Sequence, residues 1–222
     1  MFWKNHPTMW CLLGVMLAGS VTESRAQLAP RKAEEWVTTL EGPQRVASQK
    51  IDEVLSKLSL KSGMVVADIG AGSGLFSRPM AKAVAPAGKV YAVDIQQDLL
   101  DYINTRDKEE NIRNVQTVLG EFNDPKLPAR DVDLAFINDV LHHIQNRAAY
   151  LKALGTYMKA NGRIAIIEMD KNDPNTPHRK QPELLVGREE ILQWMSDAGF
   201  KLVAEHPDLF PGTKWFLIFG RK

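Results

Sequence analysis

The hydrophobic pattern of the chain consists of short, continuously apolar runs separated by stretches with helical periodicity. Continuous apolar runs are typical of parallel strands that are buried on both faces. We expect strands at 65–69, 89–95, 115–119, 132–138, 163–169, 200–206 and 215–220. Apolar residues at helical spacing favour helices over 44–58, 75–85, 98–110, 147–159 and 188–198. Strands that alternate with helices in this way indicate an α/β fold with a mostly parallel sheet.

The stretch from Val65 to Ser77 is the most informative part of the chain. An apolar strand that ends at Ile69 is followed by three alternating glycines, and a helix is predicted to begin near Leu75. Glycine allows a tight turn and a close approach of a ligand to the backbone, and the N-terminus of a helix favours bound anions. We therefore expect a nucleotide-binding edge at the carboxyl end of a sheet. A dinucleotide fingerprint requires a third glycine where this chain has Leu75.

Two motifs carry a resemblance to a known family. Asp68, Gly70, Gly72 and Gly74 form an Asp-x-Gly-x-Gly-x-Gly pattern that resembles motif I of the class I S-adenosylmethionine-dependent methyltransferases. The segment 138–144, Asn-Asp-Val-Leu-His-His-Ile, resembles motif IV of the small-molecule methyltransferases. The resemblance is closest to small bacterial methyltransferases, some of which carry export signals. It implies a seven-stranded, mostly parallel Rossmann-like sheet with helices on both faces and an antiparallel last strand.

The resemblance also implies S-adenosyl-L-methionine as cofactor and assigns residues to it. Asp94 ends the second strand, about 20 residues after the glycine loop as one βαβ unit requires, and matches the acid that holds the ribose hydroxyls. Glu121 and Phe122 match the pair that meets the adenine, although Glu replaces the commoner Asp and could be a surface acid. Trp36 and Gln49 are further candidates over the cofactor. The implied cofactor-binding set is Asp68, Gly70, Ala71, Gly72, Gly74, Asp94, Ile95, Glu121, Phe122, Asn138 and Asp139.

The candidate catalytic residues are His142 and His143. A sulfonium is already an activated methyl donor, so a general base is needed only if the acceptor must lose a proton, and histidine suits that role near neutral pH. Adjacent positions on a helix point about 100° apart, so we expect one of the two to face the cleft. The resemblance favours His142, with His143 making a structural hydrogen bond; a structural role for both is the alternative.

The sequence predicts no metal site, because it holds no cysteine set and no His-Glu-x-x-His motif. Asp139, Asp170 and Asn172 resemble only loosely the magnesium ligands of catechol-type methyltransferases, where the last two are adjacent. The segment 170–187 is rich in Pro, Asn and Lys and lacks periodicity. A long loop of this kind is often a lid, and we expect it to close over the acceptor.

Residues 1–26 are typical of a secretory signal peptide. Lys4 precedes an apolar run over 9–19, and Ser24-Arg25-Ala26 places small residues at the cleavage-determining positions. We therefore expect cleavage after Ala26 and a periplasmic protein, with membrane anchoring through an uncleaved signal as the alternative. The only cysteine, Cys11, lies in this segment. A helical extension is expected over 27–60 and the methyltransferase domain over 61–222.

The net charge of +1 does not suggest a nucleic-acid partner. The expected partner is a small-molecule acceptor, with no stable membrane insertion after signal cleavage, and the oligomeric state is left open. The expected function is methyl transfer from S-adenosylmethionine to that acceptor. Two alternatives remain at this point: a non-catalytic binding protein for S-adenosylmethionine or S-adenosylhomocysteine, and a nicotinamide oxidoreductase, which Leu75 disfavours.

Overall fold

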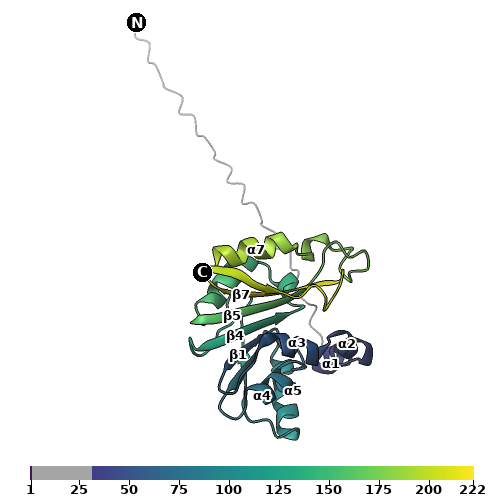
Figure 1. Ribbon diagram of the computed structural model, residues 1–222. Helices are drawn as coiled ribbons and strands as arrows, with labels where there is room; N and C mark the ends of the chain where they lie inside the picture. The colour runs from purple at the N-terminus through teal and green to yellow at the C-terminus, as the bar shows by residue number, and fades with distance from the viewer. Residues whose placement is uncertain (2–31) are drawn as a thin grey trace.

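The fold is a single seven-stranded sheet with helices on both faces (Figure 1), seen in a computed structural model that describes Met1 and residues 32–222. The strand order is β3-β2-β1-β4-β5-β7-β6. Strands β1 to β5 pair in parallel with one another, and β7 runs antiparallel between β5 and β6. The strands are β1 Val65–Ile69, β2 Lys89–Asp94, β3 Val115–Leu119, β4 Val132–Asn138, β5 Met158–Met169, β6 Phe200–Glu205 and β7 Lys214–Arg221. The predicted fold class is confirmed.

The helices cover the two faces of the sheet in separate groups. They are α1 Ala33–Leu40, α2 Pro43–Ser48, α3 Ile51–Leu58, α4 Ser77–Val84, α5 Gln97–Glu109, α6 Arg147–Gly155 and α7 Arg188–Asp197, with 3₁₀ helices η1 Leu141–His143 and η2 Pro182–Leu184. One face packs against α6 and α7, through side chains such as Leu151 and Met195. The other packs against α3, α4 and α5, through side chains such as Leu58, Met80 and Leu100. Each strand therefore supplies apolar residues to both cores, which explains the continuous apolar runs.

The N-terminal helices lie beside the carboxyl ends of the parallel strands (Figure 1). The carboxylate of Glu41, directly after α1, accepts hydrogen bonds from Arg78 at 3.1 Å and from Tyr102 at 3.2 Å. Gln49, after α2, is buried and bonded to Asp139 beyond β4. These contacts hold α1 and α2 over the edge at which we expect the ligand.

Three predicted elements, two helices and one strand, differ clearly from the structure. The helix predicted over 44–58 is interrupted at Lys50, which has a φ of 47° and separates α2 from α3. The helix predicted over 147–159 ends at Gly155, and β5 begins at Met158 rather than at Arg163. The Asn161-Gly162 pair, a sequence typical of turns, lies within β5 because Val132 of β4 pairs with Met158 across an irregular register.

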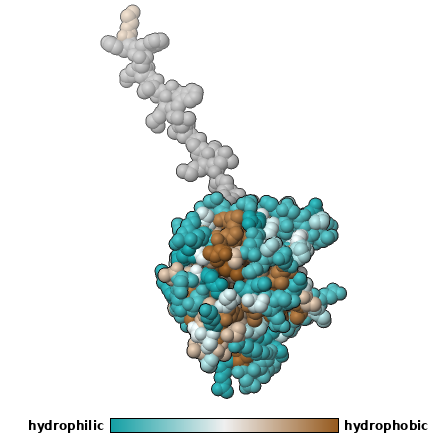
Figure 2. Space-filling view, viewed as in Figure 1, coloured by the Kyte–Doolittle hydropathy of each residue, from teal (hydrophilic) through white to brown (hydrophobic). Residues whose placement is uncertain are grey.

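The surface visible in Figure 2 is mainly hydrophilic, with apolar side chains gathered in limited areas. In residues 32–222, no helix is both long enough and apolar enough to cross a bilayer. The predicted signal peptide over 1–26 and the first residues of the extension over 27–60 lie outside the described part of the chain, apart from Met1.

Candidate functional site

The glycine loop forms one wall of a cavity of about 300 Å³. Gly70, Gly72 and Gly74 all have positive φ values, of 70°, 56° and 77°. A side chain at Gly70 would also overlap Val140 from the strand end beyond β4. The loop therefore needs glycine for its conformation and, at Gly70, for its close approach to the neighbouring loop.

Asp94 fixes this loop from the end of β2. Its Oδ2 accepts a hydrogen bond from the backbone N–H of Gly72 at 2.9 Å, and its Oδ1 accepts one from Gln96 at 3.0 Å. Burial raises the pKa of Asp94, whereas these backbone donors oppose that rise. Asp94 also lines the cavity, as a residue predicted to bind the cofactor would.

Asp68 lies beneath the glycine loop and is buried. The Ser77 hydroxyl, at the start of α4, donates to its Oδ2 at 2.5 Å. Burial raises the pKa of Asp68 from 3.8 to about 7; the Ser77 hydrogen bond opposes the rise, and Asp94 adds to it. Asp68 lines a small pocket next to the main cavity, together with Arg45, Gln49 and Asn138.

We expect Asp68→Asn to stabilise the protein at high pH and to have little effect at low pH. Between about pH 4 and pH 7 the unfolded chain releases this proton, whereas the folded chain retains it, so the free energy of unfolding falls as pH rises. Asparagine removes this cost and should raise the free energy of unfolding by roughly 1–4 kcal/mol near pH 8. Urea denaturation of both proteins at about pH 4 and pH 8 measures the difference. An equal effect at both pH values would contradict the assignment.

The rim of the cavity beyond β2 and β3 is apolar and exposed. Ile95 and Phe122 are 39% and 47% exposed, and both line the cavity. A flat ring system placed between them would cover this apolar surface. Glu121 lies at the same rim, but it is exposed and pairs with Lys126 at 3.3 Å.

Asn138 and Asp139 form a polar network in the middle of the cavity wall. Asn138 Nδ2 donates to Gln49 Oε1 at 3.0 Å, and Gln49 Nε2 donates to Asp139 Oδ2 at 3.2 Å. Burial alone would raise the pKa of Asp139, but the Lys214 ammonium at 2.7 Å and the Arg45 guanidinium hold it below its ordinary value. Within residues 32–222, Asn138 Oδ1 and Asp139 Oδ1 are buried without a hydrogen-bond partner. A ligand with N–H or O–H donors would satisfy them.

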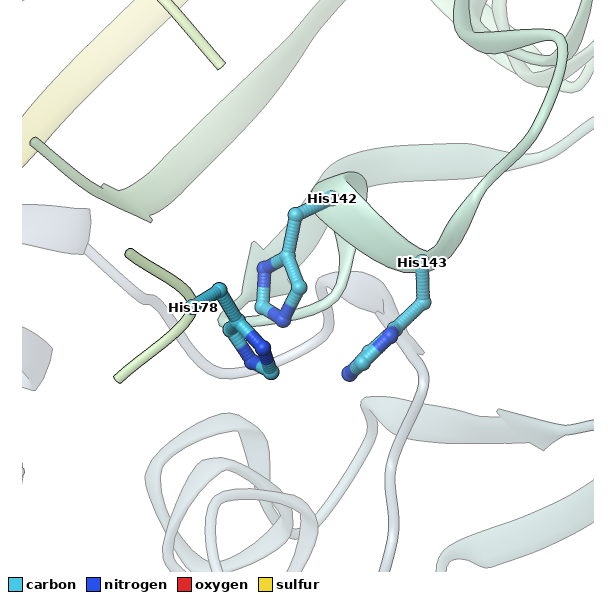
Figure 3. Close-up of side chains that lie close together, drawn as sticks. All are labelled: His142, His143 and His178. Carbon is cyan, nitrogen blue, oxygen red and sulfur yellow. The ribbon is translucent and has the colours of Figure 1, made fainter. Parts of the chain in front are cut away.

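The far end of the cavity contains three histidines. His142 and His143 come from η1, directly after β4, and His178 comes from the loop between β5 and η2. Their rings point toward one another (Figure 3), with centroids 4.0 Å apart for His142 and His143 and 4.9 Å apart for His142 and His178. The expectation that only one of the adjacent histidines faces the cleft is wrong, because η1 ends at His143 and both side chains line the cavity.

The two adjacent histidines have different surroundings. His142 is buried, and its Nδ1 lies 2.7 Å from Oε1 of the buried Glu168. With that carboxylate as acceptor, Nδ1 carries the hydrogen and Nε2 keeps the free lone pair. Burial lowers the pKa of His143 to about 3, and the neighbouring His142 and His178 rings add to the effect. His143 is therefore neutral at physiological pH and a poor proton acceptor.

Sequence reasoning missed three residues of this site. Glu168 lies inside an apolar strand, and its position opposite His142 depends on the pairing of β4 with β5. His178 lies in the loop over 170–187, which was expected near the acceptor but gave no reason to single out a residue. Lys214 reaches Asp139 from β7, far along the chain. Among the residues that the sequence did propose, Trp36 lines the main cavity and Gln49 the adjoining pocket.

A parallel sheet with an Asp-x-Gly-x-Gly-x-Gly loop, an acid at the end of β2 and an apolar rim defines a class I S-adenosylmethionine-dependent methyltransferase domain. Residues 60–199 match the family described as Methyltransferase domain, and the chain belongs to this family. The cofactor of this class is S-adenosylmethionine, and the loop, Asp94 and the apolar rim fit it.

Individual relatives agree with this family. The demethylmenaquinone methyltransferase of Staphylococcus saprophyticus is 28% identical over 128 residues, which are 58% of this chain and 53% of that protein. The matched part of the chain covers 33% to 54% of the length of such curated relatives. A SAM-dependent methyltransferase from Aquifex aeolicus superposes with a TM-score of 0.75 at 25% identity, covering 87% of this chain and 100% of that one.

The fold alone does not fix the reaction. The [4+2]-cyclase SpnF superposes with a TM-score of 0.67 at 13% identity, covering 79% of this chain and 80% of that one. One architecture therefore serves more than one kind of chemistry, and the reaction has to be argued from the site.

Proposed function

We propose that the protein transfers a methyl group from S-adenosylmethionine to a small-molecule acceptor bound at the histidine end of the cavity. The observation that carries this proposal is that one continuous cavity joins two chemically different ends. One end has the glycine loop, Asp94 and the apolar rim, which suit a nucleoside. The other has imidazoles among apolar side chains, which can receive a second ligand.

The lining of the second end favours an acceptor with an apolar body and one group that can lose a proton. Ile144, Met169 and Pro177 supply apolar surface there. Asn138 and Asp139 lie between the two ends and can orient donors on either ligand through their free oxygens. The relative from Staphylococcus saprophyticus is named for demethylmenaquinone, which is one acceptor to include in a panel.

His142 is the residue best suited to take the acceptor's proton. When bound, the cofactor would supply a methyl group on a sulfonium, which would pass to the acceptor's lone pair as its bond to sulfur breaks. Glu168 holds the His142 ring through Nδ1, so Nε2 can accept the proton that the acceptor loses. Glu168 is a positioning residue in this scheme, because it acts through His142. His143 shapes the pocket as a neutral ring.

Methyl-labelled S-adenosylmethionine tests the proposal directly. The protein is incubated with the labelled cofactor and a metabolite extract of the native host, and labelled products are identified by mass spectrometry. We expect one small molecule to gain a labelled methyl group as S-adenosylhomocysteine forms. Tight binding of S-adenosylhomocysteine without labelled product, in the extract and in a broad panel, would favour the non-catalytic binding protein.

Export is also part of the proposal. Residues 1–26 have the charge, apolar run and small residues of a cleavable signal, and we expect the mature chain to begin at Gln27. Intact-mass analysis of the protein from its native host measures this directly. Retention of Met1 would contradict cleavage, and recovery with the membrane fraction would then favour the anchored alternative.

A further inference from the structure

The three histidines form a cluster that is close to a metal-binding arrangement. One ring nitrogen from each of His142, His143 and His178 lies within 4.8 Å of the other two. The 3₁₀ helix η1 and the loop between β5 and η2 contribute, and the rings are directed into one shared space (Figure 3). Among residues 32–222, no other group of three histidine, cysteine or acidic side chains brings its possible ligand atoms this close together.

Two of the three rings make a hydrogen bond through Nδ1 of the kind that metal-binding histidines make with the nitrogen that does not bind the ion. His142 Nδ1 donates to Glu168 Oε1 at 2.7 Å, and His178 Nδ1 donates to Gln181 Oε1 at 3.2 Å when the same tautomer is present. Each contact leaves Nε2 with a free lone pair. Metal-binding histidines almost always donate their second nitrogen to a carboxylate or another oxygen in this way, which fixes the ring and its tautomer.

Glu168 is itself rigidly held. It is 1% exposed, and its carboxylate accepts further hydrogen bonds from the backbone N–H groups of His142 at 3.1 Å and Met169 at 2.9 Å. A buried carboxylate behind the cluster supplies negative charge that favours a cation among the rings. Arg147 is the opposing cation, and it is engaged by the carbonyl oxygens of Leu141 and His142 at 3.1 and 2.9 Å.

We propose that His142, His143 and His178 bind one divalent transition-metal ion, with Zn²⁺ as the first candidate. Three imidazoles are a known ligand set for zinc and leave one coordination position open. Imidazole also suits copper, nickel and iron, whereas magnesium and calcium prefer oxygen ligands. Tetrahedral zinc–nitrogen bonds of about 2.0–2.1 Å place the nitrogens about 3.3 Å apart, so nitrogens that lie within 4.8 Å of one another would have to approach by up to about 1.5 Å. His143 and His178 are only partly buried, and His178 is carried by a loop, so these two rings can supply the movement.

The open position would face the cavity that receives the acceptor. An acceptor hydroxyl or thiol bound there would lose its proton to solvent, because a bound ion stabilises the anion. His142 would then be a ligand rather than a base. This consequence rests on the proposed function, whereas ion binding itself does not. The sequence-based expectation of no metal site was made without His178, which only the fold brings to the other two.

Calorimetric titration of the untagged, chelator-treated protein with Zn²⁺ tests the inference. We expect one ion per chain with a dissociation constant at or below the micromolar range, and no comparable binding of Mg²⁺. His178→Ala should weaken Zn²⁺ binding by about 100-fold or more, and Glu168→Gln by about 10- to 100-fold. His206→Ala is the matched control, because His206 lies outside the cluster and packs on Phe216, and it should bind as the unmutated chain does.

Substoichiometric Zn²⁺ binding, or equal affinity in the unmutated chain and His178→Ala, would overturn the inference. Titration with S-adenosylhomocysteine in the same series keeps the two proposals separate. If the cofactor product binds while Zn²⁺ does not, the metal inference fails and the methyltransferase proposal stands. If neither His178→Ala nor the unmutated chain binds S-adenosylhomocysteine, the proposed function fails, whatever the result with Zn²⁺.

Discussion

Replacing His142 by alanine is expected to lower methyl-transfer turnover by about 100-fold or more while leaving cofactor affinity within about threefold. General-base catalysis contributes roughly 10²- to 10⁴-fold, and a threefold change in affinity corresponds to only ~0.7 kcal/mol. Turnover and cofactor affinity should respond differently because of where His142 lies. His142 lies on η1, beyond the polar residues Asn138 and Asp139, and its ring contacts Glu168 rather than the glycine loop or Asp94.

Calorimetry with S-adenosylhomocysteine measures the binding half of this prediction, and a labelled-methyl assay measures turnover once an acceptor is found. His206→Ala is the control for loss of a histidine elsewhere in the chain. Glu168→Gln should lower turnover less than His142→Ala and change its pH profile, because it alters the partner of Nδ1 and keeps the ring. A large loss of cofactor affinity in His142→Ala, with circular dichroism unchanged, would place this histidine at the cofactor instead.

Chelation distinguishes the two roles that the structure allows for His142. If His142 acts as a base, removal of metal ions should leave the turnover of the unmutated enzyme unchanged. If it acts as a zinc ligand, chelation should lower turnover to the level of His142→Ala, and added Zn²⁺ should restore it. The substitution alone cannot make this distinction, because both roles need the same Nε2.

The cofactor half of the site was accessible from sequence because its signals are local. The run Val65–Ile69 is apolar except for Asp68 and is followed by alternating glycines, so both the strand and the turn were predicted at the right residues. Asp94 lies one βαβ unit after the loop and was assigned through the family resemblance. Neither inference needs information about distant parts of the chain.

The acceptor half was less accessible because it is assembled by tertiary contacts. Glu168 is one acid in an apolar strand, and only the β4–β5 pairing places it against His142. His178 lies in an aperiodic loop, where a histidine has no local signal. The irregular start of β5 was missed for a similar reason: Asn161-Gly162 is a strong turn signal, and the pairing of Val132 with Met158 overrides it.

Replacing Asp94 by alanine is expected to weaken binding of S-adenosylhomocysteine by ~1–3 kcal/mol, or about 5- to 150-fold. The side chain has two functions that alanine removes: it lines the cavity where ribose hydroxyls would donate to it, and it holds the backbone N–H of Gly72. Asp94→Asn should weaken binding less than Asp94→Ala does, because the amide oxygen of asparagine can still accept one of these hydrogen bonds.

Glu121→Ala is the matched comparison for Asp94→Ala, since both acids line the same cavity and only Asp94 is buried. Glu121 is exposed and paired with Lys126, and exposed ion pairs contribute ~0–1 kcal/mol, so its removal should change affinity by less than about fivefold. Isothermal titration of the three variants and the unmutated chain with S-adenosylhomocysteine gives all four values on one scale. Equal losses in Asp94→Ala and Glu121→Ala would mean that the buried carboxylate has no special role at the ribose. Unchanged affinity in Asp94→Ala would mean that Asp94 does not hold the ribose. The expected orientation of the cofactor would then lose its basis, and so would the assignment of the acceptor to the histidine end of the cavity.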